Sequence, residues 1–137
     1  MANSLKTLFI IGAILTLAGS FLPWRREGDF VSYWTYGIRI YPVLKDSGGL
    51  LIVILTLIVT ILVFRPPDFI GKPLIWGILL SLALVFDSAF HIGKLLIDRT
   101  NAIGIIGAPA IQIGLVMVSI GSILLLLSAV IYYFRSP

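Results

Sequence analysis

Four polar residues recur at helical spacing in one long apolar stretch of the chain. Asp87, His91, Lys94 and Asp98 are spaced by four, three and four residues, which would bring them onto one side of a helix. Asp87 lies deep in the stretch, and an ionisable side chain inside a membrane is costly and commonly functional. Gln112, in the following apolar stretch, is a candidate hydrogen-bond partner. The stripe is therefore a candidate proton or cation path, a lipid or ligand site, or a docking surface.

The same stripe also has a structural interpretation. A bond from Asp87 to Gln112, or to serines of the last apolar stretch, would hold two helices together inside the membrane. Lys94 and Asp98 would then form an ordinary ion pair at the membrane surface. We favour structure or docking over ion handling for this stripe.

Cofactor, metal and nucleophile chemistry all receive little support from these residues. His91 is the only histidine, whereas a four-helix haem protein normally supplies two axial histidines. His91 could therefore provide only one ligand to a haem or to a chlorophyll-type magnesium. One histidine without cysteine cannot close a metal site. Ser88 lies beside Asp87, but nothing in the sequence marks it as an activated nucleophile. We predict no enzymatic activity and no metal, and the sequence indicates no particular cofactor.

The composition places the chain in a membrane. Of its 137 residues, 59% are hydrophobic and 12% are charged, whereas a soluble domain carries about 25% charged residues. The net charge of +4 is scattered and forms no basic run, which argues against nucleic-acid binding and suits a lipid bilayer with anionic headgroups. There are no cysteines, so a disulfide framework is excluded.

Hydrophobic runs predict the architecture that positions these residues. We expect an all-α membrane protein: a single domain over residues 1–137 that forms a four-transmembrane-helix bundle. The expected spans are about 5–23, 48–64, 74–97 and 107–134. The first run also has the make-up of a signal peptide, but we interpret it as a retained span. The larger first loop, 24–47, is rich in Tyr, Trp, Val and Ile. This composition is compatible with a short strand pair or with an interfacial helix.

Small residues at regular intervals predict how the spans pack. Lipid tails are as apolar as leucine, so membrane helices associate where small side chains let their backbones approach. Such residues recur every seven positions in the fourth span and at the same interval in the first, which makes these two spans the expected tight pair. The expected seam consists of Gly12, Thr16, Gly19, Gly107, Gly114, Gly121 and Ser128.

Four spans would put both termini on one side of the membrane. Aromatic and basic residues near the span ends are expected at the membrane surfaces. These interfacial candidates are Trp24, Arg25, Arg26, Trp34, Trp76, Tyr132 and Tyr133. The short loop 65–72 is basic and contains two prolines, as in a cytoplasmic turn, so we expect the termini in the cytoplasm of a bacterial cell.

The first half of the chain resembles a diffuse group of small bacterial four-span membrane proteins that have no assigned activity. In that pattern the first span ends in Leu-Pro-Trp, here Leu22-Pro23-Trp24, and the second span opens after Asp46-Ser47-Gly48-Gly49. The resemblance implies an outer first loop and brings no functional residue with it.

The expected function follows from few chemical groups and many packing positions. We expect a non-catalytic accessory or scaffold subunit of a larger membrane complex, respiratory or photosynthetic, whose partners are other membrane subunits. One alternative is a small transporter or channel subunit that uses Asp87 and His91 as a proton or cation relay. The other is a lipid- or pigment-binding membrane protein.

Overall fold

Four helices and a small sheet make up the described part of the chain. The computed structural model describes residues 2–27, 33–36, 48–68, 70–101, 110–111 and 113–136. The helices are α1 (Asn3–Phe21), α2 (Gly48–Phe64), α3 (Pro73–Asn101) and α4 (Ile113–Arg135). The prediction of long apolar helices is confirmed, because α1, α3 and α4 are each long and apolar enough to cross a membrane, while α2 is shorter.

Prolines set several of the helix ends. α1 stops at Phe21 because Leu22 is extended and Pro23 follows, and the residue before a proline is pushed out of helical geometry. α2 ends at Phe64, immediately before Arg65-Pro66. Pro73 opens α3 at the first helical position, where its missing N–H costs no hydrogen bond.

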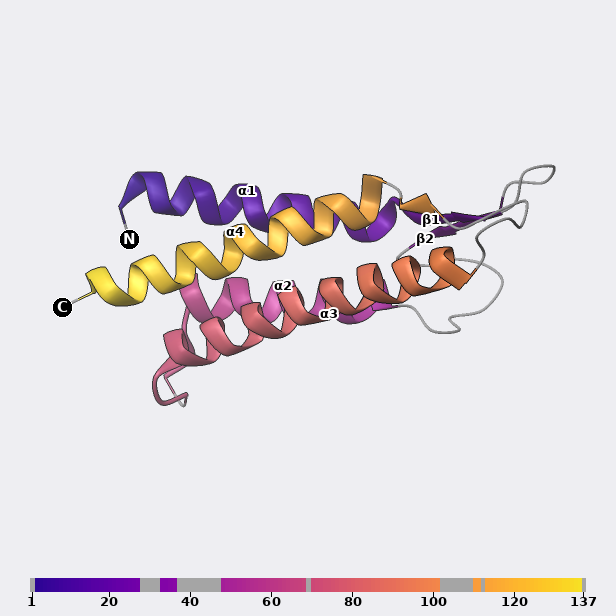
Figure 1. Ribbon diagram of the computed structural model, residues 1–137. Helices are drawn as coiled ribbons and strands as arrows, with labels where there is room; N and C mark the ends of the chain where they lie inside the picture. The colour runs from indigo at the N-terminus through magenta and orange to yellow at the C-terminus, as the bar shows by residue number, and fades with distance from the viewer. Residues whose placement is uncertain are drawn as a thin grey trace.

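The helices lie side by side and form a ring of neighbours. α1 packs against α4 most extensively, α4 against α3, α3 against α2, and α2 against α1. Both termini and the connection between α2 and α3 lie at one end of this bundle, and the sheet lies at the other (Figure 1). We call these the terminal end and the sheet end. Fully buried apolar side chains from all four helices fill the interior, among them Phe9, Ile52, Leu84 and Leu125.

Glycines bring the backbones of α1 and α4 together. A Cβ atom placed on Gly12 would lie 2.9 Å from the Gly121 carbonyl oxygen, and one on Gly19 would lie 2.7 Å from the Gly114 carbonyl oxygen. A Cβ on Gly121 would meet Thr16 directly. Real Cβ atoms do not approach backbone this closely, so only glycine fits at these crossing points.

The remaining members of the expected seam lie in different surroundings. Ser128 is buried on α4, and its hydroxyl donates to the Leu124 carbonyl oxygen over 2.7 Å. Gly107 lies outside the described residues. The structure therefore places the seam of α1 and α4 at two glycine pairs, Gly12 with Gly121 and Gly19 with Gly114, together with Thr16.

A three-stranded antiparallel sheet occupies the sheet end. Its strands are β1 (Pro23–Glu27), β2 (Tyr33–Tyr36) and β3 (Ala110–Ile111), in the order β2-β1-β3. The strand-pair alternative for loop 24–47 therefore holds in the described part of that loop. The register shifts between Pro23, which pairs with Tyr36, and Arg25, which pairs with Thr35. Trp24 is thus an extra residue on β1, as in a β-bulge.

One sequence expectation needs correction at this end. The fourth helix begins at Ile113 and not near 107, because the backbones of Ala110 and Ile111 pair with Arg26 and Arg25 of β1 and are drawn into the sheet. The all-α class is confirmed for the four helices, and the sheet is confined to the short segments that connect them. Apolar periodicity cannot separate a two-residue strand from the start of a helix.

The glycine seam generates a stability prediction. Gly121→Ala should lower the free energy of unfolding by about 1–3 kcal/mol, because the new methyl group meets backbone atoms of α1 that cannot move aside cheaply. The measurement is a denaturant titration of the purified protein in detergent micelles, followed by circular dichroism. Gly93→Ala is the matched control, since nothing lies within 4 Å of a Cβ at Gly93. Equal unfolding curves for the two variants would contradict the role of the seam.

Candidate functional site

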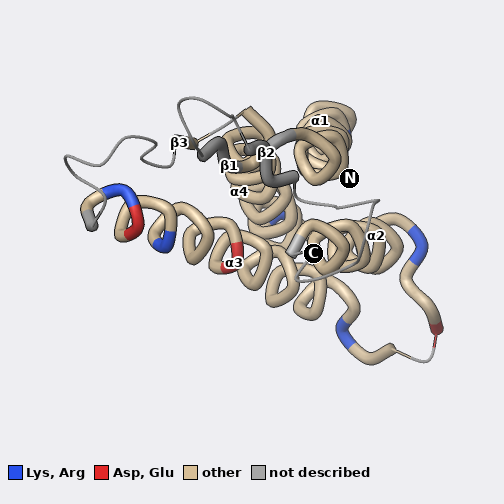
Figure 2. Tube along the Cα trace, turned by 90° about the vertical axis from the view of Figure 1, so that its right-hand side faces the viewer, with Lys and Arg blue, Asp and Glu red and all other residues tan. Residues whose placement is uncertain are grey.

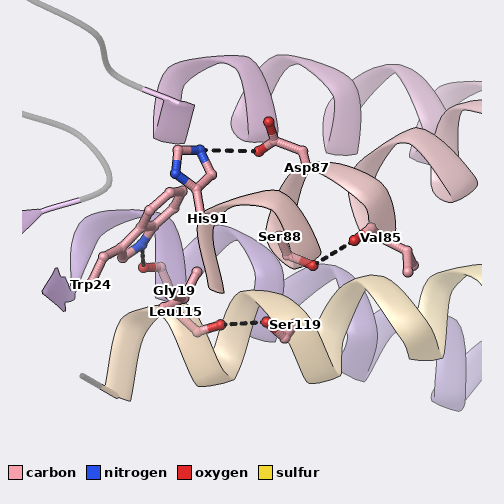
Figure 3. Close-up of polar contacts among 8 residues, drawn as sticks. All are labelled: Gly19, Trp24, Val85, Asp87, Ser88, His91, Leu115 and Ser119. Carbon is pink, nitrogen blue, oxygen red and sulfur yellow. Dashed lines mark hydrogen bonds and ion pairs between the residues drawn. The ribbon is translucent and has the colours of Figure 1, made fainter. Parts of the chain in front are cut away.

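Asp87 and His91 face one another on α3 in the half nearer the sheet. His91 Nε2 lies 3.7 Å from Asp87 Oδ2 (Figure 3), which is an ion-pair distance and too long for a hydrogen bond. The Asp87 side chain is 23% exposed and that of His91 30% exposed. Oδ2 itself is buried and accepts no hydrogen bond from the residues that the structure describes. The site therefore holds a carboxyl oxygen that is shielded from solvent and still able to accept a donor.

Trp24 closes the side of this pair toward the sheet. Its indole and the His91 imidazole meet edge to face, with ring centroids 5.0 Å apart and an angle of 70° between the planes. Its Nε1–H donates to the Gly19 carbonyl oxygen over 2.8 Å (Figure 3). The side chain is only 6% exposed. Trp24 thus links the end of α1 to the middle of α3.

Local structure explains why Trp24 turns inward. A bulge re-aims the side chain of the extra residue, and the register shift in β1 falls at Trp24. The last carbonyl groups of a helix have no partner within the helix. The Gly19 carbonyl receives both the Leu22 N–H, at 3.3 Å, and the indole N–H. The sequence Leu22-Pro23-Trp24 therefore stops α1 and caps it.

Aromatic rings enclose the imidazole on a second side. The rings of Phe90 and His91 lie with centroids 5.8 Å apart at 76°. His91 is thereby held between Trp24, Phe90 and the Asp87 carboxyl group. Such a pair can exchange a proton, or present one acceptor and one imidazole to a bound group. The carboxyl group and the imidazole provide two ligands, and in the described part of the chain no three metal-ligating side chains come together.

Ser88 is not turned toward this pair. Its hydroxyl donates to the Val85 carbonyl oxygen over 2.9 Å, in its own helix. Ser119 of α4, which faces this region, donates in the same way to the Leu115 carbonyl oxygen over 2.8 Å. Neither hydroxyl is arranged as a nucleophile beside the imidazole.

The rest of the stripe runs from the pair toward the sheet end. Lys94 is exposed and lines a hollow of about 300 Å³ together with Phe90, Gly93 and Ile97, which we call the Gly93 hollow. Asp98 is half-buried. Gln112 lies outside the described residues, so its bond to Asp87 stays a prediction. Figure 2 shows charged residues along this half of α3 and at the α2–α3 connection.

The interfacial candidates are found in several environments. Trp76 and Tyr133 are exposed at the terminal end, and Tyr132 beside them is half-buried. Trp24 differs from the expectation, because it is buried in the protein and does not face headgroups. The side chains of Arg25, Arg26 and Trp34 lie outside what the structure describes.

Sequence reasoning missed three residues of this region. Trp24 was expected at the membrane surface, because its return onto Gly19 depends on a register shift that has no local signature. Phe90 and Gly93 were not predicted as site residues. Their spacing relative to Lys94 and Ile97 could have indicated a helix-packing hole. Residues at positions i, i+3, i+4 and i+7 border one hole on a helix surface.

Comparison of the chain with protein-family models, with curated proteins and with solved structures finds no match. The resemblance based on Leu22-Pro23-Trp24 therefore stays a prediction. Functional inference rests on the geometry of α3 and its surroundings.

The indole cap generates a second prediction. Trp24→Phe should lower the free energy of unfolding by about 1 kcal/mol, because the ring is kept while the donor to the Gly19 carbonyl is lost. The measurement is the same micelle titration. Trp76→Phe removes an exposed indole at the opposite end and should leave the unfolding midpoint unchanged. An unchanged unfolding midpoint in Trp24→Phe would show that the bond has no part in stability.

Proposed function

We propose that the protein is a non-catalytic accessory or scaffold subunit of a larger membrane complex. In this proposal the outer face of α3 binds a helix of a neighbouring membrane subunit. The observation that carries the proposal is the Gly93 hollow, which lies on an exposed helix face beside two partly exposed ionisable groups.

The proposal includes a membrane frame in which all four helices span. α2 has 17 residues, hence a length of about 26 Å, which is at the short end for a span. It carries no charged residue and packs beside α3 along the bundle. A cytoplasmic terminal end of a bacterial membrane is part of the same proposal. It is supported by Lys6, Arg65, Lys72 and Arg135, which lie there with Asp68 as the single acid among the described residues.

The Gly93 hollow has the form of a helix-packing hole. Its residues 90, 93, 94 and 97 are spaced as the four residues that surround one inserted side chain in knobs-into-holes packing. Gly93 forms the floor, and nothing lies within 4 Å of a Cβ placed there. Phe90 and Ile97 are among the most exposed apolar side chains of the chain's described part. A large apolar side chain of a second helix would fill this hole.

The ionisable pair favours a protein neighbour for this face. Asp87 is the midpoint of α3, about 21 Å along the helix from Pro73, so it would lie near the centre of the bilayer. Partial exposure of a carboxyl group and an imidazole to lipid is expensive at that depth. A neighbouring helix with a hydroxyl, amide or ammonium donor would cover the exposed parts of both groups.

The polar stripe extends through only one half of the bundle. From Asp87 toward the terminal end, α3 has no Asp, Glu, Lys, Arg or His, and neither α2 nor α4 before Arg135 has one. A path that ends at mid-membrane suits a docked group better than transport across the bilayer. This difference ranks the subunit proposal above the relay.

Blocking the hollow tests the proposal. Gly93→Leu should fill the hole with its own side chain and reduce recovery of a partner by about tenfold or more, whereas the fold is kept because the position is open. The measurement is purification of tagged protein in mild detergent from its native membrane, followed by native mass spectrometry of the intact complex.

Gly71→Leu is the matched control, because Gly71 also has nothing within 4 Å and lies in the α2–α3 connection away from the hollow. It should keep the partner at wild-type stoichiometry. Recovery of the wild-type chain alone would sink the subunit proposal. So would a partner that is retained equally by Gly93→Leu.

A relay remains the second candidate, because Asp87 Oδ2 is buried beside an imidazole and has no donor among the described residues. It predicts that wild-type protein in liposomes carries a proton or cation flux, and that Asp87→Asn abolishes it while the circular dichroism spectrum is unchanged. A flux that persists in Asp87→Asn, or liposomes that show none with the wild type, would exclude this role.

A further inference from the structure

A second open site lies at the terminal end, away from α3's outer face. The start of α3 and the end of α4 border a groove of about 700 Å³, which we call the Lys72 groove. Residues from both segments line it, chiefly Lys72, Leu74, Ile75, Tyr133, Phe134 and Ser136. It is larger than the Gly93 hollow and plays no part in the proposed docking at α3.

The lining combines a cation, hydroxyl groups and an apolar wall. Lys72 supplies an ammonium group, and Tyr133 and Ser136 each supply a hydroxyl that can donate a hydrogen bond. Leu74 and Phe134 supply apolar surface in the same groove. A molecule that fits this lining has an anionic oxygen-rich head joined to an apolar body.

Backbone hydrogen bonds hold Lys72 in a defined position at the start of α3. Lys72 has a φ of 54°, the only positive value among the described non-glycine residues. Its carbonyl oxygen accepts the N–H groups of Ile75, at 3.1 Å, and Trp76, at 3.5 Å, in the first turn of α3. The Lys72 backbone is therefore hydrogen-bonded to the first turn of α3, and this fixes the position of its Cα atom beside the groove.

The position of the groove identifies the class of ligand. It lies where α3 begins and α4 ends, which in the membrane frame is the level of the lipid headgroups. Exposed Trp76 and Tyr133 at this end are the residue types that favour this level. The molecules that occupy such a groove in a bilayer are lipids.

Charge selects among those lipids. Besides Lys72, the terminal end carries Lys6, Arg65 and Arg135, against Asp68 as the single acid in the described part of this end. Basic residues beside the membrane attract anionic headgroups within about a Debye length. A zwitterionic headgroup would leave this excess of positive charge unmatched.

We propose that the Lys72 groove binds an anionic phospholipid. The phosphate lies against the Lys72 ammonium group and the hydroxyls of Tyr133 and Ser136. The glycerol and the upper acyl chain lie along Leu74 and Phe134. The inference rests on the membrane frame of the proposed function, but it does not depend on docking at α3, because it uses the opposite end of the bundle.

The test compares retention of defined lipids on purified, detergent-solubilised protein by native mass spectrometry. Dioleoyl phosphatidylglycerol and dioleoyl phosphatidylcholine are titrated separately, so that only headgroup charge differs. Wild type should retain phosphatidylglycerol about fivefold or more over phosphatidylcholine, and Lys72→Gln should lose most of that preference. Tyr133→Phe, which keeps the ring and removes the hydroxyl, should lose a smaller part of it.

Lys6→Gln is the matched control, since it removes the same charge at the same end, and Lys6 lies 5.9 Å over the Phe64 ring and away from the groove. It should keep most of the wild-type preference, because the Lys6 charge adds to the general field of this end but does not line the groove. Equal retention of the two lipids by wild type, or equal losses in Lys6→Gln and Lys72→Gln, would overturn the proposal.

A separate arm distinguishes a lipid from a free anion. Inorganic phosphate is added at millimolar concentration to protein that carries phosphatidylglycerol. Retention of the lipid is the expected result, because the apolar wall contributes to lipid binding and not to phosphate binding. Complete displacement by phosphate alone would assign the groove to a soluble anion and overturn the lipid assignment.

Discussion

Close contact between the backbones of α1 and α4 is the constraint on which the other features depend. Gly12 meets Gly121, and Gly19 meets Gly114, at distances that exclude any side chain. In a membrane this contact cannot come from burial of apolar surface alone, since the lipid is equally apolar. The side-chain hydroxyls of the neighbourhood bond within their own helices, as Thr16 does to the Gly12 carbonyl over 2.7 Å. Shape therefore fixes the pair, and the pair fixes where α1 ends.

The end of α1 in turn positions the polar site. Gly19 takes part both in the seam and in the cap, because its Cα packs against α4 while its carbonyl accepts the Trp24 indole N–H. The bulge in β1 and the pairing of β1 with β3 hold Trp24 over His91. Thus the distance of 3.7 Å between His91 and Asp87 on α3 has support from a residue far away in sequence.

The two ends of the bundle differ in the chemistry they expose. The half toward the sheet carries a carboxyl group, an imidazole and a lysine beside a hole of helix-packing form. The terminal end carries basic residues and a groove with an apolar wall. Between them the helices are uncharged (Figure 2). This separation is consistent with protein contact at one level of the membrane and lipid contact at another.

The sequence by itself determined the helices, because long apolar runs bounded by prolines have few other solutions in lipid. It also determined that Asp87 and His91 share a face, since spacing by four residues fixes that in any helix. Tertiary structure alone decided that Trp24 turns inward, that residues 110–111 join the sheet, and that the Gly93 hollow stays open. Each of these features depends on which segments, distant in sequence, become neighbours in space. Local spacing along the chain does not determine those neighbours.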